Sequence, residues 1–205
     1  MDTAALITAF VTLFVVIDPI GLAPLFVALT QGADTRHRRG VALRACLIGG
    51  GILTAFGLAG EAVLGFAGIS MSAFRIAGGI LLFLTALDML FERRTKRRGD
   101  QASTHPEDPS VFPLATPLIA GPGAIATMIL LTTQPGADWT WVLLVHLVMG
   151  SVILLCLAFF LLAAPIERGL GPVGINVVTR RLGMLLAALS VQFVLDGIAE
   201  LGILG

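Results

Sequence analysis

Two short motifs stand out because each combines prolines and a glycine with a polar residue inside a long apolar run. Residues 18–24 read Asp-Pro-Ile-Gly-Leu-Ala-Pro, and residues 116–122 read Thr-Pro-Leu-Ile-Ala-Gly-Pro. Proline removes a backbone N–H donor and clashes with the preceding turn, at a cost of about 3 kcal/mol within a helix. We therefore expect each motif to break a helix and to expose backbone groups that need another partner. The positive end of the half-helix that follows would suit the carboxylate of a small solute, whereas a plain kink for close packing is the alternative.

Asp18 adds a charge to the first motif. It lies roughly 20 Å along its apolar run, at about 1.5 Å per helical residue. A carboxylate at that depth in a bilayer costs at least about 2.5 kcal/mol, so its side chain should face the protein interior or a cavity. Two roles that do not exclude each other are open to Asp18. It can cap the second half-helix directly before Pro19, or it can hold a coupling proton or Na⁺.

Further polar residues recur near the end of the chain. Gln192, Asp196 and Glu200 are spaced four residues apart, which places them on one helix face. We expect a polar stripe that faces a water-filled path, with Glu200 at the membrane interface. No catalytic residue or metal ligand is predicted, and no cofactor is expected beyond a coupling H⁺ or Na⁺. The predicted pathway residues are Asp18, Pro19, Gly21, Pro24, Thr116, Pro117, Gly121, Pro122, Gly123, Gln192 and Asp196.

The composition indicates the elements that position these residues. Of 205 residues, 57% are hydrophobic and 13% are charged, whereas soluble domains carry about a quarter charged residues. Several uncharged runs exceed the roughly 20 residues that cross a bilayer as a helix. Cys46 and Cys156 lie in apolar segments without metal or redox spacing, so both are interpreted as small hydrophobic residues. We predict an all-α fold with six transmembrane helices at about 4–29, 42–66, 70–91, 111–134, 140–164 and 182–203, of which the first and fourth are broken.

The basic residues predict the orientation. Twelve of the 13 lie in the connections after the first, third and fifth helices, and Arg75 alone lies on the other side. By the positive-inside rule, the basic side faces the cytoplasm and both termini face outward. The predicted location is therefore the inner membrane of a bacterium. The net charge of +0 gives no indication of nucleic-acid binding, so the expected partners are the lipid bilayer and a small solute, and a homo-oligomer is compatible with the sequence.

The chain also carries an internal repeat. The two proline motifs match at an offset of 98 residues, and Arg75-Ile-Ala-Gly matches Arg180-Arg-Leu-Gly at an offset of 105. Each half has three predicted spans, so the second half must enter the membrane from the opposite face, as in many secondary transporters. The predicted units are a first repeat over residues 1–91, a polar cytoplasmic linker over 92–110 and a second repeat over 111–205.

The motifs resemble the MarC family of bacterial integral membrane proteins. The resemblance is carried by residues 18–21, 24–26 and 117–125, together with residues 74–79 and 192–198, and it covers essentially the whole chain. It implies six helices of the lysine-exporter-like superfamily in the inner membrane, and transport of small neutral amino acids such as alanine and glycine in some relatives. One departure concerns Leu22, where many relatives have asparagine. A side-chain amide beside the break is therefore missing here.

Three classes of function are compared. The leading hypothesis is a secondary transporter that exports a small neutral amino acid coupled to an ion gradient. No P-loop occurs, so direct use of ATP is not expected. An intramembrane hydrolase lacks support, because the chain has no serine-hydrolase, zinc-protease or paired-aspartate motif. A non-transporting membrane subunit or scaffold is the remaining alternative, and it predicts a solid core at the proline motifs.

Overall fold

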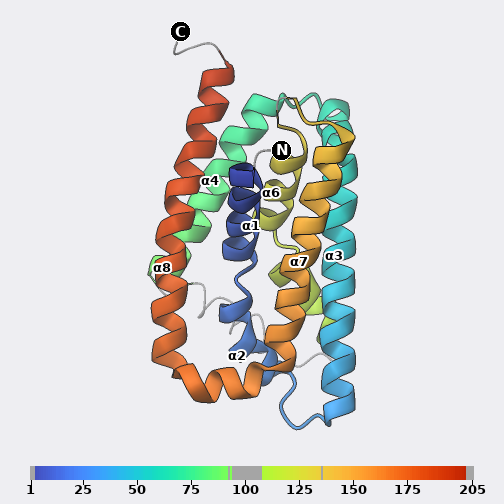
Figure 1. Ribbon diagram of the computed structural model, residues 1–205, viewed down its shortest axis with the longest axis vertical. Coiled ribbons are helices and arrows are strands. Elements are labelled where there is room, and N and C mark those ends of the chain that lie inside the picture. The colour runs from blue at the N-terminus through green and yellow to red at the C-terminus, as the bar shows by residue number, and fades with distance from the viewer. Residues whose placement is uncertain (1–2, 92, 94–107, 135, 202–205) are drawn as a thin grey trace.

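A computed structural model describes residues 3–91, 93, 108–134 and 136–201 of the chain. Helices account for every regular element in these residues, and no strand occurs among them. Five helical segments are long and apolar enough to cross a membrane, and a bent pair of helices makes up a sixth. The predicted all-helical fold is therefore confirmed, with five candidate spans, or six when the bent pair is counted as one. The segments stand side by side in an elongated bundle (Figure 1).

The first three spans are formed by four helices. The first span consists of α1 (Thr3–Ile17) and α2 (Pro19–Leu29), which Asp18 separates. The second span is α3 (Thr35–Phe66), and the third is α4 (Met71–Leu90). We call the end of the bundle that carries Arg36, Arg38 and Arg39 the basic end; in Figure 1 it is the lower end.

The last three spans begin with a second broken segment. Wide π-type turns form η1 (Ser110–Ile119), and α6 (Pro122–Thr132) follows after a bend of 53°. The fifth span is α7 (Trp139–Leu161). The helix α8 (Ala163–Glu200) has a non-helical break at Gly171, where φ is 62°, a region that favours glycine. Its first part runs across the basic end of the bundle, and the part from Val173 onward forms the sixth span (Figure 1).

Short polar side chains define where three of the helices begin. The carboxylates of Asp34 and Asp138 accept hydrogen bonds from the backbone N–H of His37 at 2.6 Å and of Trp141 at 2.8 Å. The hydroxyl of Ser70 accepts one from the N–H of Ala73 at 3.2 Å. Each side chain satisfies one of the amide groups that a helix leaves unpaired in its first turn.

Helices α4 and α8 pack closely against each other through glycines, and the contacts are reciprocal. A Cβ atom on Gly79 of α4 would lie 2.8 Å from the carbonyl oxygen of Ser190 in α8. A Cβ atom on Gly183 of α8 would lie 2.9 Å from Cβ of Met89 in α4. Small residues let membrane helices approach to backbone contact. A Cβ atom on Gly197 of α8 would likewise lie 3.0 Å from the carbonyl oxygen of Ser72 in α4, so both helices of the antiparallel pair use glycines for close contact.

Several predicted boundaries need correction. The second helix begins at Thr35 rather than at 42, because the Asp34 cap starts the helix before the membrane and charged residues continue it. The sixth helix was predicted to begin at 182, but the helix of the sixth span already runs from Val173. Arg180 and Arg181 consequently lie on a helix and not in a loop. Most of the predicted linker 92–110, and the last residues of the predicted sixth helix, lie outside the described residues.

Candidate functional site: two broken membrane spans

The break in the first span is a single residue with a buried charge. Asp18 is fully buried and has φ 57° and ψ 63°, in the left-handed region that aspartate tolerates better than most residues. Its carboxylate accepts a hydrogen bond from the backbone N–H of Gly21 at 3.1 Å, and Pro19 occupies the first turn of α2. This geometry confirms the predicted capping role of Asp18. The predicted role in ion coupling stays a prediction.

Glycine at position 21 is required by the cap itself. A Cβ atom on Gly21 would collide with the carboxylate of Asp18. Pro24, in the next turn, has no N–H to donate to the carbonyl of Ile20, so this backbone acceptor of α2 lacks its usual donor. Leu22 is fully buried in the hydrophobic core, so apolar packing fills this position beside the break.

The break in the fourth span is longer and carries no charge. Within η1 the backbone of Thr116 is extended, with φ −132° and ψ 121°, and the N–H of Ala120 donates to the carbonyl of Ala115 at 2.9 Å. Pro117 lies inside η1. Gly121 is the N-cap residue of α6 and supplies no side-chain cap, and the helix begins at Pro122. A Cβ atom on Gly121 would lie 2.5 Å from the carbonyl oxygen of Pro117, so the bend leaves no room for a side chain.

The two breaks lie next to each other inside the bundle. A Cβ atom on Gly123, in the first turn of α6, would be 3.4 Å from Val16, which is two residues before Asp18. It would also be 3.3 Å from Leu82 and 3.7 Å from the hydroxyl of Thr85, both in α4. The hydroxyl of Thr127 donates to the carbonyl of Gly123 at 2.8 Å. Val16 and Gly123, which flank the two motifs and are 107 positions apart in the chain, therefore meet where α1, α4 and α6 converge.

Comparison with known proteins agrees with this architecture. Residues 3–202 match the model of the MarC family of integral membrane proteins. The chain belongs to the MarC family. A UPF0056 membrane protein of Archaeoglobus fulgidus is 40% identical over 195 residues, which cover 94% of this chain and 91% of the relative. The UPF0056 inner membrane protein YhgN of Escherichia coli is 35% identical over 196 residues, which cover 94% and 95% of the two chains. No solved structure matches the chain.

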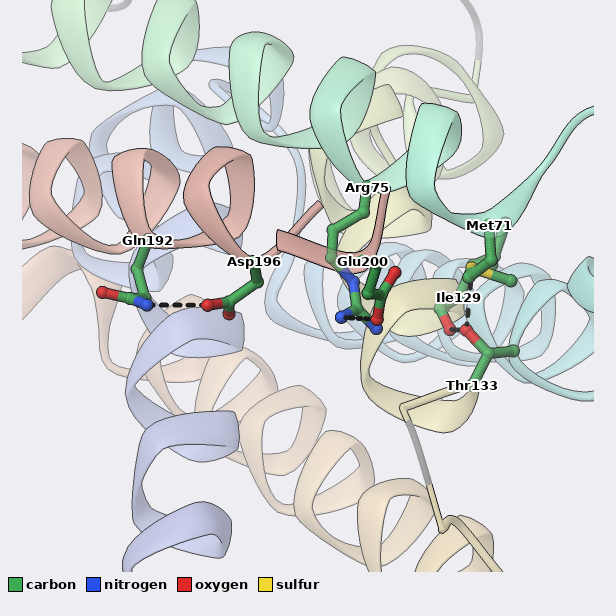
Figure 2. Close-up of polar contacts among 7 residues, drawn as sticks. All are labelled: Met71, Arg75, Ile129, Thr133, Gln192, Asp196 and Glu200. Atoms are coloured by element: carbon green, nitrogen blue, oxygen red, sulfur yellow. Dashed lines mark hydrogen bonds and ion pairs between the residues drawn. The ribbon is translucent and has the colours of Figure 1, made fainter. Parts of the chain in front are cut away.

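The polar residues predicted near the end of this MarC protein form two separate contacts (Figure 2). The amide of Gln192 donates to the carboxylate of Asp196 at 2.7 Å, on an exposed part of α8. Glu200 instead forms an ion pair with Arg75 of α4, whose side chain is largely buried. The predicted common face is confirmed for Gln192 and Asp196, which bond to each other. A water-filled path along them stays a prediction.

The ion pair between Arg75 and Glu200 was not predicted. The two residues are 125 positions apart, and no local pattern links them. The sequence contained one indication of such a pair: Arg75 is the single basic residue on its side of the predicted membrane. A buried arginine requires an acidic partner, and Glu200 is the acid at the same end of the neighbouring span. The pair joins α4 and α8 at the end opposite the basic end.

Two cavities at the basic end of this MarC protein were also missed. One has a volume of about 370 Å³ and is lined by residues that include Pro24, Ala28 and Gln31. The other has a volume of about 320 Å³ and is lined by residues from α2, α3, α7 and the start of α8. Arg38 lines both cavities. Sequence patterns do not show cavities, because these depend on how four helix ends are arranged.

Proposed function

We propose that this MarC protein is a secondary transporter that exports a small zwitterionic solute, such as a small neutral amino acid, coupled to H⁺ or Na⁺. It acts on its solute without catalysing a chemical reaction. The name of the Escherichia coli relative, an inner membrane protein, supports the same location for this chain. The positive-inside rule orients the basic end toward the cytoplasm and both termini outward.

The observation that carries this proposal is the meeting of two broken spans in the interior. Helix ends in the middle of a membrane are expensive, because lipid cannot pair with their backbone groups. Transporters use such ends to bind solutes near the bilayer midplane. The contact between Val16 and Gly123 supports a single site formed by both breaks. The reciprocal packing of α4 and α8 supports an origin of this site in a 3+3 inverted repeat.

The two breaks supply complementary charges for a zwitterion. In this proposal the first turn of α6, which has no side-chain cap, receives the carboxylate of the solute. The buried carboxylate of Asp18 holds the coupling cation. The cavity beside Pro24 supports entry from the basic end, because it reaches α2 within two turns of Asp18. A volume of about 370 Å³ falls in the range of small-molecule sites.

Counterflow in proteoliposomes tests the proposal. Purified protein is reconstituted with unlabelled alanine or glycine inside the vesicles, and accumulation of the labelled amino acid is measured with and without a H⁺ or Na⁺ gradient. Accumulation above that of protein-free vesicles is expected. If no small neutral amino acid accumulates under any gradient, the substrate class is wrong.

The coupling role of Asp18 is tested with Asp18→Asn. Asparagine caps helices about as well as aspartate, so this variant should fold and still exchange solute, but its flux should no longer respond to the ion gradient. The matched control is Glu61→Gln, which removes an exposed acid of α3 far from both breaks in the sequence. An unchanged ion response in Asp18→Asn would refute the coupling role.

A scaffold or subunit without transport activity is a second candidate. The observation in its favour is the tight packing at the breaks, where Asp18, Leu22 and Ala124 are almost completely buried. A transporter must open this region to water during its cycle, whereas a scaffold need not. The two candidates are distinguished with Thr127→Cys in a Cys46→Ala/Cys156→Ala background. If the protein is a transporter, this cysteine should react with a small membrane-permeant thiol reagent. If it is a scaffold, the cysteine should stay unreactive. Complete protection at all temperatures below unfolding would favour the scaffold.

A further inference from the structure

Two arginines line a cavity at the basic end, and among the residues that the structure describes neither has an acidic partner. Arg38 and Arg39 follow each other in α3, and both line the cavity of about 320 Å³. Ion pairs among the described residues involve Arg44 and Arg75 but neither of these two arginines. Arg38 is partly buried and Arg39 is exposed, and an anion would offset the cost of the partly buried guanidinium group of Arg38. The cavity therefore offers two positive charges for which the described residues supply no anion.

The floor of this cavity is rigid and aromatic. The rings of Phe26 and Phe160 stack with their centroids 4.6 Å apart, and both side chains are almost completely buried. The guanidinium carbon of Arg38 lies 5.8 Å from the centroid of the Phe26 ring, within the range of a cation–π contact. This contact holds Arg38 over the floor. The arginine is thus positioned in advance, which lowers the entropic cost of binding a ligand.

The location of the cavity identifies the kind of ligand. It lies where α2 ends, α3 begins and α7 ends, which is the level of the lipid headgroups for membrane-spanning helices. The first part of α8 runs across the same end of the bundle (Figure 1). Leu161 and Leu162 line the cavity and are each about half exposed, at 50% and 55%. A ligand with an anionic head and apolar chains matches arginines beside exposed leucines.

We propose that this cavity is a binding site for the phosphate of an anionic phospholipid of the cytoplasmic leaflet. Arginine recognises phosphate oxygens through paired, parallel N–H donors. Arg38 and Arg39 bind the phosphate, Thr35 lines the same cavity and can offer its hydroxyl as a further donor, and the acyl chains lie against Leu161 and Leu162. Basic pockets between membrane helices are known to bind anionic headgroups in this way. The site is independent of the proposed transport function.

A general attraction between basic residues and anionic lipid would not require this cavity. Arg36 provides the matched control, because it carries the same charge on the same turn of α3, is exposed and lines neither cavity. If the cavity is the binding site, substitution of Arg38 should weaken lipid binding more than substitution of Arg36. A diffuse attraction by positive charge predicts equal effects of the two substitutions.

Native mass spectrometry of the full-length protein released from detergent micelles tests this difference. Wild-type protein is titrated with phosphatidylglycerol or with phosphatidylcholine that has the same acyl chains. We expect preferential binding of phosphatidylglycerol, about tenfold weaker binding in Arg38→Gln/Arg39→Gln, and a change of less than about twofold in Arg36→Gln. Equal binding of the two lipids by the wild type overturns the site, and this result does not depend on any variant that fails to fold. An equal loss in Arg36→Gln also overturns it.

A second arm distinguishes the lipid from a soluble phosphate. The thermal stability of the protein is measured with phosphatidylglycerol, with glycerol phosphate and with inorganic phosphate at constant ionic strength. Stabilisation by the lipid alone supports the proposal, because the acyl chains then contribute through Leu161 and Leu162. Stabilisation of the same size by either soluble phosphate, again lost in Arg38→Gln/Arg39→Gln, would overturn the assignment to a lipid.

Discussion

The two broken spans of this MarC protein restart their helices in different ways. In the first span, one left-handed residue separates the half-helices, and the carboxylate of Asp18 caps α2 immediately. In the fourth span, the backbone widens over the ten residues of η1, and α6 begins at Pro122 after Gly121, which provides no side-chain cap. The first break therefore depends on a side chain. The second break depends on the absence of a side chain, because Gly121 lies against the carbonyl of Pro117.

Because of this difference, the two breaks have different electrostatic environments, whereas two identical repeats would give both breaks the same one. Residues 109–137 contain no charged side chain, so the first turn of α6 keeps its partial positive charge. The first turn of α2 is matched by a carboxylate. In the proposed function, the pair of breaks consequently distinguishes the two ends of a zwitterion. Substitutions at each break test whether it depends on the group assigned to it.

The largest effect is expected for Gly121→Ala. A Cβ atom at this position would lie 2.5 Å from the backbone oxygen of Pro117, which cannot move without changing the bend. We expect the free energy of unfolding in detergent to fall by about 2–3 kcal/mol, measured from the shift in the denaturation midpoint. The control is Gly51→Ala, because a Cβ atom on Gly51 of α3 meets nothing within 4 Å. Equal stability of the two variants would show that the second break does not depend on glycine.

A smaller effect is expected for Asp18→Ala. Alanine removes the cap of α2 and is strained at a φ of 57°, so a loss of about 1–2 kcal/mol is expected in the same assay. Asp18→Asn should stay within about 0.5 kcal/mol of the wild type, because asparagine caps well and tolerates this backbone region. If Asp18→Asn were as unstable as Asp18→Ala, the charge rather than the cap would hold the first break together.

The contact between Asp18 and Gly21 should appear as an energetic coupling of about 1 kcal/mol. Gly21→Ala forces the carboxylate to rotate away and breaks its hydrogen bond of 3.1 Å to the backbone N–H of residue 21. In an Asp18→Gly background there is no carboxylate to displace, so the same alanine should be neutral or stabilising within the helix. A double-mutant cycle by thermal unfolding measures the coupling. Strictly additive effects would contradict the geometry of the cap.

The sequence predicted both breaks because their cause is local. Pro19 and Pro117 each prevent a regular helix wherever the fold places them, and Asp18 before Pro19 is a typical cap signal. The number of spans was likewise predictable from the long apolar runs. Helix ends were less predictable: the Asp34 cap and the break at Gly171 move helix boundaries outside the apolar segments, where hydropathy gives no signal.

The contacts between distant segments could not be predicted from a single chain. The pairing of Arg75 with Glu200 and the contact of Val16 with Gly123 depend on which helices become neighbours. In a membrane, this choice is made by the complementarity of small and large side chains rather than by the apolar pattern, since lipid is as apolar as the helices. The roles of the two breaks in transport stay predictions for the same reason.

The smallest effect is expected for the acid nearest to the fourth span, Asp108, which lies just before η1. A hydrogen bond with the hydroxyl of Ser110 is the largest cause that holds the pKa of Asp108 below its ordinary value, and the backbone N–H of Ser110 and Arg44 act in the same direction against partial burial. The carboxylate is 3.0 Å from Arg44, but both side chains are about half exposed, so Asp108→Asn should cost less than about 1 kcal/mol at neutral pH.

The pH dependence of this variant has a defined sign. Because the pKa of Asp108 is lower in the folded than in the unfolded protein, its ionisation stabilises the fold above the unfolded value of about 3.9. This contribution is lost as the pH falls through the folded pKa. The melting temperatures of the wild type and Asp108→Asn should therefore differ at pH 6 and converge below about pH 4. A loss in Asp108→Asn larger than that in Asp18→Ala would mean that the entrance of the fourth span, and not the break in the first, contains the more important acid.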